Sequence, residues 1–315
     1  MDPLKYRTLL YYCYTRISDP EAFAGQHLKF CRSLQLTGRI IVAEEGLNGT
    51  VSGLPSACDE YMLALSTDSR FAGIDFKVDE VDKPSFTRMH CRHKPEIVHL
   101  GVDDTVNIDP NRVTGKHLEP AQFRELKNRD DVVILDVRSN YEHELGHFKN
   151  AVRLDLDNFR DFPAKINELA KYKNKTIVTY CTGGIKCEKA SALLIHEGFE
   201  DVYQLKGGII KYGKEIGGED FDGKCYVFDN RLAVDVNTVN PTVISTCKSC
   251  GTVSPRMINC ANPECNQHFL QCETCGIETD GCCCDTCKNH PLKRPYDGTG
   301  YYVRILHSGI AMKKA

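Results

Sequence analysis

Residues 180–191 read YCTGGIKCEKAS, and they stand between the apolar run TIVTYC and the helical pattern of EKASALLIHEGF. The same alternation of apolar runs with helical patterns extends over residues 117–216. Strands that alternate with helices are typical of βαβ units in a parallel sheet. We therefore expect Cys181 at the carboxyl end of a central strand, which is the edge where open α/β sheets bind ligands.

The residues after Cys181 suit a loop that curls around an anion. They are Thr182, Gly183, Gly184, Ile185, Lys186 and Cys187. Backbone amides at a helix N-terminus stabilise a thiolate, and a nearby cation adds to this effect. We predict a lowered pKa and a nucleophilic sulfur at Cys181. The weaker alternative is a buried small hydrophobic residue. Cys187 is interpreted as a resolving thiol or as a packed residue at the helix start.

The position of the cation separates two enzyme classes. Cysteine phosphatases carry an arginine six positions after the cysteine, whereas rhodaneses carry the cation five positions after it. Lys186 stands at position five, so the loop resembles that of a rhodanese, whose cysteine carries sulfur as a persulfide. The segments LDVRSNYEHELGHFKNA and LKGGIIKY extend this resemblance over residues 117–216. The supporting residues that it implies are Asp136, Arg138 and Glu142.

A second motif lies inside that stretch, because residues 143–147 read HELGH and match H-E-x-x-H. On a helix this spacing offers two imidazoles to zinc and a general base. The segment follows a strand by a few residues, contains a glycine and runs into another strand. We interpret the motif as a chance match.

The first 85 residues predict a ferredoxin-like domain with the order β-α-β-β-α-β. Its first helix is expected to begin at Ser18 or Asp19, with Pro20 in the first turn. The two central strands are predicted to be joined by a turn at residues 45–48, Glu-Gly-Leu-Asn.

The C-terminal third carries the strongest compositional signal, since ten of the 17 cysteines lie between Cys247 and Cys287. Two pairs of converging thiolates make one tetrahedral zinc site, so four clusters predict two structural zinc sites. We favour Cys247 and Cys250 with Cys272 and Cys275. The second set is Cys260, Cys265 and Cys287 with one of Cys282, Cys283 or Cys284, of which Cys283 is chosen. Sequential pairing is the alternative.

Together these features predict a multidomain protein of α/β and α+β class. The predicted order is a ferredoxin-like domain (1–85), a basic connector (86–116), a rhodanese-like parallel α/β domain (117–216), a linker with a small cysteine-rich zinc module (217–290) and a basic tail (291–315). A net charge of -3 argues against a globally basic nucleic-acid binder, although local basic patches are compatible with one.

The whole arrangement, and the loop CTGGI-x-CEKA above all, resembles the bacterial tRNA uridine(34) hydroxylases. The resemblance implies an acylphosphatase-like N-terminal domain and oxygen-dependent conversion of the wobble uridine of tRNA to 5-hydroxyuridine, with molecular oxygen as co-substrate. The essential cysteine of the family corresponds to Cys181. Members commonly have arginine where this chain has Lys186, which keeps the charge and loses the bidentate fork.

A thiolate or persulfide at Cys181 would act as redox partner or add to C6 of the uracil ring. The sequence contains no G-x-G-x-x-G flavin fingerprint and no convincing iron-binding set of two histidines and one carboxylate. For contact with tRNA we expect Arg88, Arg92 and Lys94 in the connector.

Two alternative functions stay open at this point. They are a sulfurtransferase that carries a persulfide on Cys181 and a non-catalytic adaptor that binds zinc and RNA. Without a signal-peptide pattern or an apolar run of membrane-spanning length, the chain is expected to be cytoplasmic and to have no membrane contact.

Overall fold

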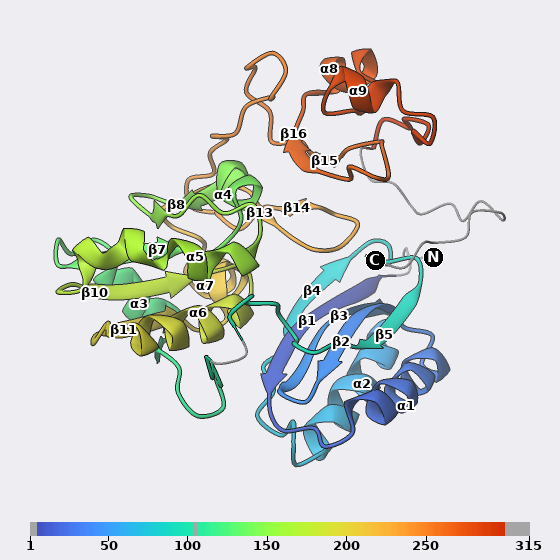
Figure 1. Cartoon of the computed structure of the whole chain (residues 1–315). Helices are drawn as coiled ribbons and strands as arrows, with labels where there is room; N and C mark the ends of the chain where they lie inside the picture. Colours follow the sequence, from blue (N-terminus) through green and yellow to red (C-terminus); the bar gives the residue numbers. More distant parts are fainter. Residues whose placement is uncertain (1–4, 104–105, 300–315) are drawn as a thin grey trace.

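The computed structural model describes residues 5–103 and 106–299. Its N-terminal domain is a five-stranded sheet with two helices packed on one face (Figure 1). The strand order is β4-β1-β3-β2-β5; β5 runs parallel to β2, and the other pairs are antiparallel. Its elements are β1 (Tyr6–Tyr14), α1 (Pro20–Ser33), β2 (Thr37–Ala43), β3 (Gly46–Gly53), α2 (Pro55–Thr67), β4 (Lys77–Val81) and β5 (Met89–His93). The predicted β-α-β-β-α-β order is present, with one strand added.

Helix α1 begins as predicted, because Asp19 accepts a hydrogen bond from the amide of Ala22 and Pro20 occupies the first turn. The predicted bounds of the turn, residues 45–48, are wrong, because it begins one residue earlier and ends three residues earlier. The chain turns at Glu44 and Glu45, and β3 already begins at Gly46. Gly46 has φ of 146°, and a Cβ there would lie 2.0 Å from the carbonyl oxygen of Cys13. Only glycine lets the neighbouring strand approach so closely.

The added strand, β5, lies in the segment that the sequence analysis assigned to the connector. Met89 and Cys91 are buried, whereas His90 and Arg92 are exposed. This alternation is that of a strand with one buried face. The basic residues of the predicted connector therefore lie on or beside the edge strand of the N-terminal sheet.

The central domain is built on a parallel sheet with strand order β6-β11-β10-β7-β9, which confirms the predicted class. Its elements are β6 (Lys116–Leu118), α3 (Pro120–Leu126), β7 (Val132–Asp136), α4 (Asn140–Leu145), β8 (Gly146–Phe148), β9 (Val152–Arg153), α5 (Phe162–Lys165), β10 (Thr176–Tyr180), α6 (Ile185–His196), β11 (Val202–Leu205) and α7 (Gly208–Ile216); 3-10 helices cover Phe159–Asp161 and Ile166–Tyr172. Successive residues of β10 enter two different cores, Ile177 on one face and Val178 on the other. The sheet is thus buried on both faces.

The C-terminal region follows the central domain without a free linker, because β12 pairs antiparallel with β8. Its elements are β12 (Phe221–Gly223), β13 (Cys225–Tyr226), β14 (Ala233–Val234), β15 (Met257–Asn259), β16 (His268–Leu270), α8 (Glu273–Glu278) and α9 (Asp285–Lys288). Part of the predicted basic tail, residues 300–315, lies outside the described residues. Within the described residues, no helix combines the length and apolar character needed to span a bilayer.

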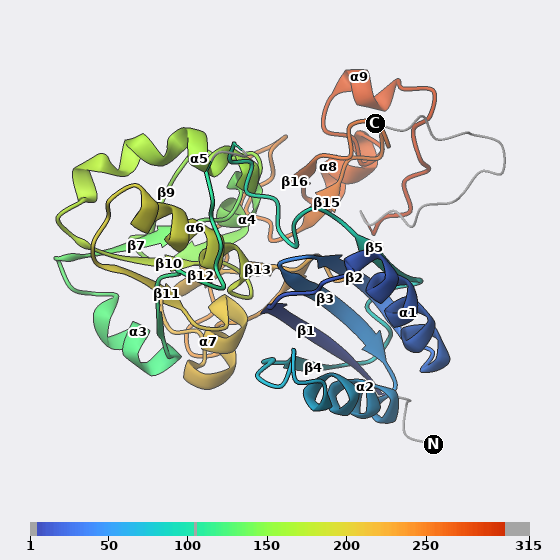
Figure 2. The same cartoon turned by 60° about the horizontal axis from the view of Figure 1, so that its bottom comes forward.

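The N-terminal sheet lies beside the α6 and α7 side of the central domain in both views (Figures 1 and 2). At one end of this boundary Asp79 of β4 pairs with Lys214 of α7 at 2.5 Å, and it also pairs with Arg231 of the C-terminal region at 2.9 Å. Strand β1 lies against the start of α6, where the hydroxyl of Tyr14 donates to the carbonyl oxygen of Ile185.

Candidate active site and metal centres

The predicted loop runs from the end of β10 into the first turn of α6. The amide of Gly184 donates a hydrogen bond of 3.1 Å to Sγ of Cys181. Gly184 precedes the helix with φ of 102°, a left-handed conformation that favours glycine. The carbonyl oxygens of Cys181 and Thr182 accept hydrogen bonds from α7, which anchors the loop from behind. The loop therefore surrounds the sulfur, whose residue is only 1% exposed.

The surroundings of Cys181 favour its ionised form. Burial opposes ionisation, but the thiol of Cys187, the charge of Lys186 and the amides of Lys186 and Gly184 outweigh it and lower the pKa of Cys181 to about 7. Burial, followed by the nearby Cys181 sulfur, raises the pKa of Cys187 well above its usual value. One sulfur of the pair is thus held as a thiolate and the other as a thiol.

Lys186 is fixed by Glu142. Its Nζ lies 2.6 Å from Oε2 of Glu142, a side chain with no exposed surface. The same carboxylate accepts the amide of Ser139 and so closes the capping box of α4. The Lys186 ammonium also lies 5.4 Å from the ring centre of Phe228. Glu142 receives one contact from the ammonium of Lys186, so the two parallel hydrogen bonds that an arginine could donate are not used here.

Asp136 and Arg138 form a buried network behind α4. Arg138 donates to both carboxylate oxygens of Asp136, at 2.9 and 2.7 Å, and to the carbonyl oxygen of Gly146. Asp136 also contacts His143 and Tyr180. Although burial opposes ionisation, the charge of Arg138 and the contact with His143 keep the pKa of Asp136 below its usual value. Of the three predicted supporting residues, the structure joins Glu142 to the loop and joins Asp136 and Arg138 to each other.

The N-terminal domain covers the loop, which the sequence analysis did not anticipate. A Cβ on Gly183 would lie 3.0 Å from Cδ2 of Leu10, and one on Gly184 would lie 2.9 Å from the hydroxyl of Tyr12. The hydroxyl of Tyr14 donates to the carbonyl oxygen of Ile185 at 3.4 Å. Three alternate residues of β1 therefore face the loop, and the two glycines leave room for them.

The charged pair after Cys187 binds the same domain. Oε1 of Glu188 accepts the hydroxyl of Tyr12 at 2.9 Å, and its other oxygen accepts Thr114 and Gln204. Nζ of Lys189 lies 2.8 Å from Oε1 of Glu45 and 3.1 Å from Oε1 of Glu96, and Lys189 is 2% exposed. Sequence reasoning missed this role. Two adjacent charges in a buried stretch that is otherwise apolar or small, residues 187–194, were the available signal.

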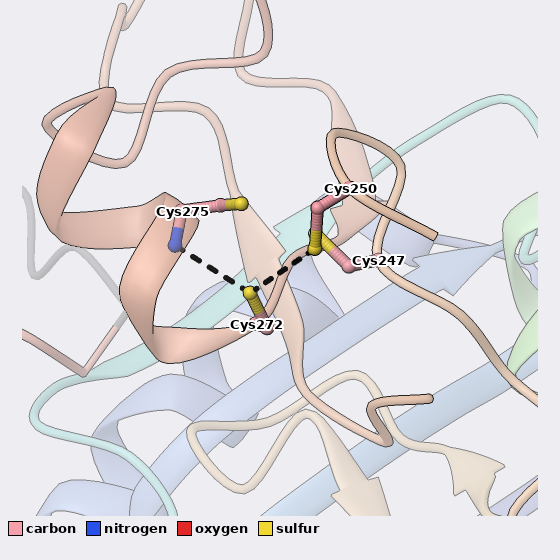
Figure 3. Close-up of side chains that lie close together, drawn as sticks. All are labelled: Cys247, Cys250, Cys272 and Cys275. Carbon is pink, nitrogen blue, oxygen red and sulfur yellow. Dashed lines mark hydrogen bonds between the residues drawn. The ribbon is translucent and has the colours of Figure 1, made fainter. Parts of the chain in front are cut away.

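The cysteine-rich region gathers its sulfurs into two groups of four. Within each group all four sulfurs lie within 4.8 Å of one another, so each could hold a metal ion. The first group draws on two separate segments of chain, which bring its sulfurs together from opposite sides (Figure 3). The groups are Cys247, Cys250, Cys272 and Cys275, and Cys260, Cys265, Cys283 and Cys287. This is the interleaved arrangement with Cys283, and the sequential pairing is not formed.

Comparison with known families agrees with each part of this structure. Three family models match: "UPF0176 acylphosphatase like domain" over residues 6–97, "Rhodanese-like domain" over 119–215 and "Rhodanase C-terminal" over 222–288. A tRNA uridine(34) hydroxylase of Cytophaga hutchinsonii is 59% identical over 96% of both chains. Proteins of the same name from Staphylococcus saprophyticus and Shouchella clausii are 52% and 50% identical, over 92% and 91% of this chain and 92% and 89% of theirs.

The chain belongs to the tRNA uridine(34) hydroxylase family. Its N-terminal domain is accordingly acylphosphatase-like and its central domain rhodanese-like. The resemblance inferred from the loop and the cysteine clusters is confirmed.

In this member of the tRNA uridine(34) hydroxylase family, the H-E-x-x-H segment does not have the form of a zinc helix. Helix α4 ends at Leu145, and His147 lies in β8. The rings of His143 and His147 stack with centroids 3.9 Å apart and an angle of 3°. His143 uses Nδ1 to contact Asp136, and His147 uses Nδ1 to contact the carbonyl oxygen of His143. The histidines stack on each other in a structural arrangement, in line with a chance match.

The exposed residues Arg88, Arg92 and Lys94 lie on and beside β5. The structure adds Arg32 of α1 and Arg39 of β2 to this surface. Partial burial, followed by the charges of Arg92, Arg39, Arg88 and Arg32, lowers the pKa of the histidine between them, His90. We call Arg32, Arg39, Arg88 and Arg92 the arginine patch. Sequence analysis found only half of it, because the other half comes from elements distant in the chain.

Proposed function

We propose that this chain is a tRNA-modifying oxidoreductase that hydroxylates uridine 34, with the sulfur of Cys181 as its reactive group. The observation that carries the proposal is the match, over 96% of both chains, to a relative of that name. The site supports it, because a thiol with a pKa of about 7 is about half ionised at neutral pH, whereas an ordinary cysteine is mostly protonated there. In the proposed reaction molecular oxygen is the co-substrate and 5-hydroxyuridine the product.

In the same proposal the arginine patch and Lys94 bind the tRNA backbone. Among the ion pairs of residues 5–103 and 106–299, none involves the four arginines of the patch. Their guanidinium groups are therefore available to phosphates, which supply most of the affinity in nucleic-acid complexes. Phosphate contacts of this kind position the tRNA but do not distinguish its bases. Recognition of uridine is therefore assigned to the site around Cys181.

The test of this function uses the purified chain and two tRNA transcripts that differ only at position 34. With uridine 34, air and a thiol reductant, nucleoside mass spectrometry should detect 5-hydroxyuridine. Cytidine at position 34 should give none, and neither should a reaction under nitrogen. If uridine 34 stays unmodified after the reaction, although Cys181 is reactive and the tRNA is bound, the proposal is contradicted.

A sulfurtransferase is the second candidate, because the loop places its cation five positions after Cys181 as rhodaneses do. Transfer of sulfur from thiosulfate to cyanide, together with unmodified tRNA, would favour it. The names of the relatives favour an enzyme over a non-catalytic adaptor.

We propose zinc as the occupant of both cysteine groups, because four thiolates and no open position suit a structural zinc ion. Zinc would hold the short elements of this region together, since metal binding supplies folding energy. The Cys272→Ser variant should then bind about one zinc ion per chain where the unaltered protein binds about two. The measurement is elemental analysis by mass spectrometry after gel filtration.

Cys284→Ser is the matched control for that experiment. Cys284 is exposed and stands outside both groups of four, although it is adjacent to Cys283. Its variant should keep about two zinc ions. A loss of zinc on replacing Cys284, with none on replacing Cys272, would show that the ligand assignment is incorrect.

A further inference from the structure

The loop around Cys181 contains a second buried thiol, Cys187. The amide of Gly184 bonds to Sγ of Cys181 at 3.1 Å, and the carbonyl oxygen of Gly184 accepts the amide of Cys187 at 3.1 Å. The chain thus turns back over the first sulfur, and the side chains of Cys181 and Cys187 interact there. Cys181 and Cys187 are 1% and 0% exposed and belong to the same core cluster.

The two sulfurs differ in a way that suits thiol–disulfide chemistry. Cys181 is the ionised member, stabilised by the loop amides and by Lys186, and Cys187 is the protonated member. In dithiol redox sites a low-pKa thiolate reacts first and a neighbouring thiol then closes the disulfide. A serine or alanine at position 187 would fill similar space, but neither could form the second bond.

Hydroxylation by molecular oxygen has an electron requirement that such a pair can meet. Replacing the C5 hydrogen of uridine by a hydroxyl group uses one oxygen atom of O₂, and the other leaves as water. Two electrons and two protons are needed besides the uridine. Two thiols supply both when they join as a disulfide.

We propose that Cys181 and Cys187 are the two-electron donor of the reaction and that each turnover leaves them joined by a disulfide. This inference rests on the proposed function. In the balanced step, uridine, O₂ and two thiols give 5-hydroxyuridine, water and one disulfide. The O–O, C5–H and two S–H bonds break, and the C5–O and S–S bonds form. The hydrogen from C5 ends on the new hydroxyl group, and the two thiol protons leave in the water molecule. A small thiol or a dithiol protein then reduces the disulfide and restores the site.

The order of events follows from the asymmetry of the pair. Molecular oxygen first adds at C5, and the hydrogen from C5 moves to the outer oxygen, which gives a hydroperoxide without external electrons. The thiolate of Cys181 then takes the distal oxygen and becomes a sulfenic acid, while the uridine keeps the other oxygen. The thiol of Cys187 attacks this sulfenic acid, releases water and forms the disulfide. Cys187 is thus a catalytic residue in this proposal, because it contacts the reacting sulfur.

The test is a single turnover with fully reduced protein, tRNA and air, in the absence of any free thiol. The unaltered chain should form about one 5-hydroxyuridine per chain and stop, with a Cys181–Cys187 disulfide in its peptide map. Added dithiothreitol should restart it. A product that accumulates while both thiols stay reduced would overturn the inference and leave the proposed function intact.

The Cys187→Ser variant should still give one product per chain, but with Cys181 trapped by dimedone as a sulfenic acid. With a dithiol protein as the reductant, its repeated turnover should fall at least about tenfold, because it forms no disulfide for that reductant to reduce. Cys225→Ser is the matched control, because Cys225 is fully buried and its thiol lies close to Thr182 of the same loop. If Cys187→Ser turned over like the control, the inference would be wrong. If no protein formed product with any reductant, the proposed function would fail as well.

Discussion

The Cys181→Ser variant should form no 5-hydroxyuridine above the background of a reaction without protein. Serine fits the loop and accepts the same amide, but its hydroxyl stays protonated at every pH of interest and cannot take up an oxygen or a sulfur atom as a thiolate does. Removing a nucleophile commonly costs several orders of magnitude, so we expect a loss of roughly 10³-fold or more. Nucleoside mass spectrometry of the uridine 34 transcript measures it.

The control for this variant is Cys13→Ser. Cys13 lies on β1 between Tyr12 and Tyr14, but its sulfur is directed toward the carbonyl oxygen of Arg70. We expect the activity of this variant to stay within about twofold of that of the unaltered chain. A Cys181→Ser protein that still hydroxylates uridine 34 would remove the sulfur from the mechanism.

A second measurement on the unaltered chain checks that the sulfur is ionised. Because the pKa of Cys181 is lowered to about 7, its alkylation rate should be half-maximal near pH 7 and level off above it. An unperturbed cysteine would still be mostly protonated there. Peptide-resolved alkylation separates Cys181 from the other cysteines. If the alkylation rate were half-maximal near the ordinary cysteine pKa, the loop amides and Lys186 would not stabilise the thiolate.

The loop could be predicted from the sequence because its determinants are local. The strand before Cys181, the glycine at position 184 and the cation at position 186 lie within a few residues of each other, and their spacing defines the geometry. The same holds for the cysteine pairs, since a C-x-x-C turn already directs two sulfurs to one point. The sequence pattern and the structure agree where the interacting residues are close together in the chain.

The cover on the loop could not be predicted in this way. Tyr12 and Glu188 are 176 residues apart in the chain, and the CEKA motif that contains Glu188 does not indicate what its carboxylate binds. Residues 9–14 of β1 are a continuous apolar run, LLYYCY, and such a run does not indicate which part of the chain covers the second face of the strand. The half of the arginine patch that was missed has the same cause, because Arg32 and Arg39 reach it only through the packing of α1 and β2.

We expect the second large effect from Lys189→Met, because Lys189 joins α6 to the N-terminal domain that covers the loop. Lys189 is 2% exposed and joins α6 to both Glu45 and Glu96, so its loss leaves two facing carboxylates without their cation. Breaking a buried pair costs about 3–5 kcal/mol, and we expect about 2–3 kcal/mol because both carboxylates retain some contact with water. The N-terminal domain should then separate from the loop more often. Formation of 5-hydroxyuridine should fall.

Alkylation of Cys181 should change in the opposite direction to activity. A sulfur on a residue 1% exposed reacts when the domains open, and each 1.4 kcal/mol lost multiplies the open population about tenfold. Lys189→Met should therefore raise the alkylation rate by roughly 30- to 140-fold, with an unchanged circular dichroism spectrum. Lys165→Met is the control, because Lys165 pairs with Glu168 on the surface and such pairs contribute little. Equal alkylation rates in the two variants would mean that the N-terminal domain does not close the site.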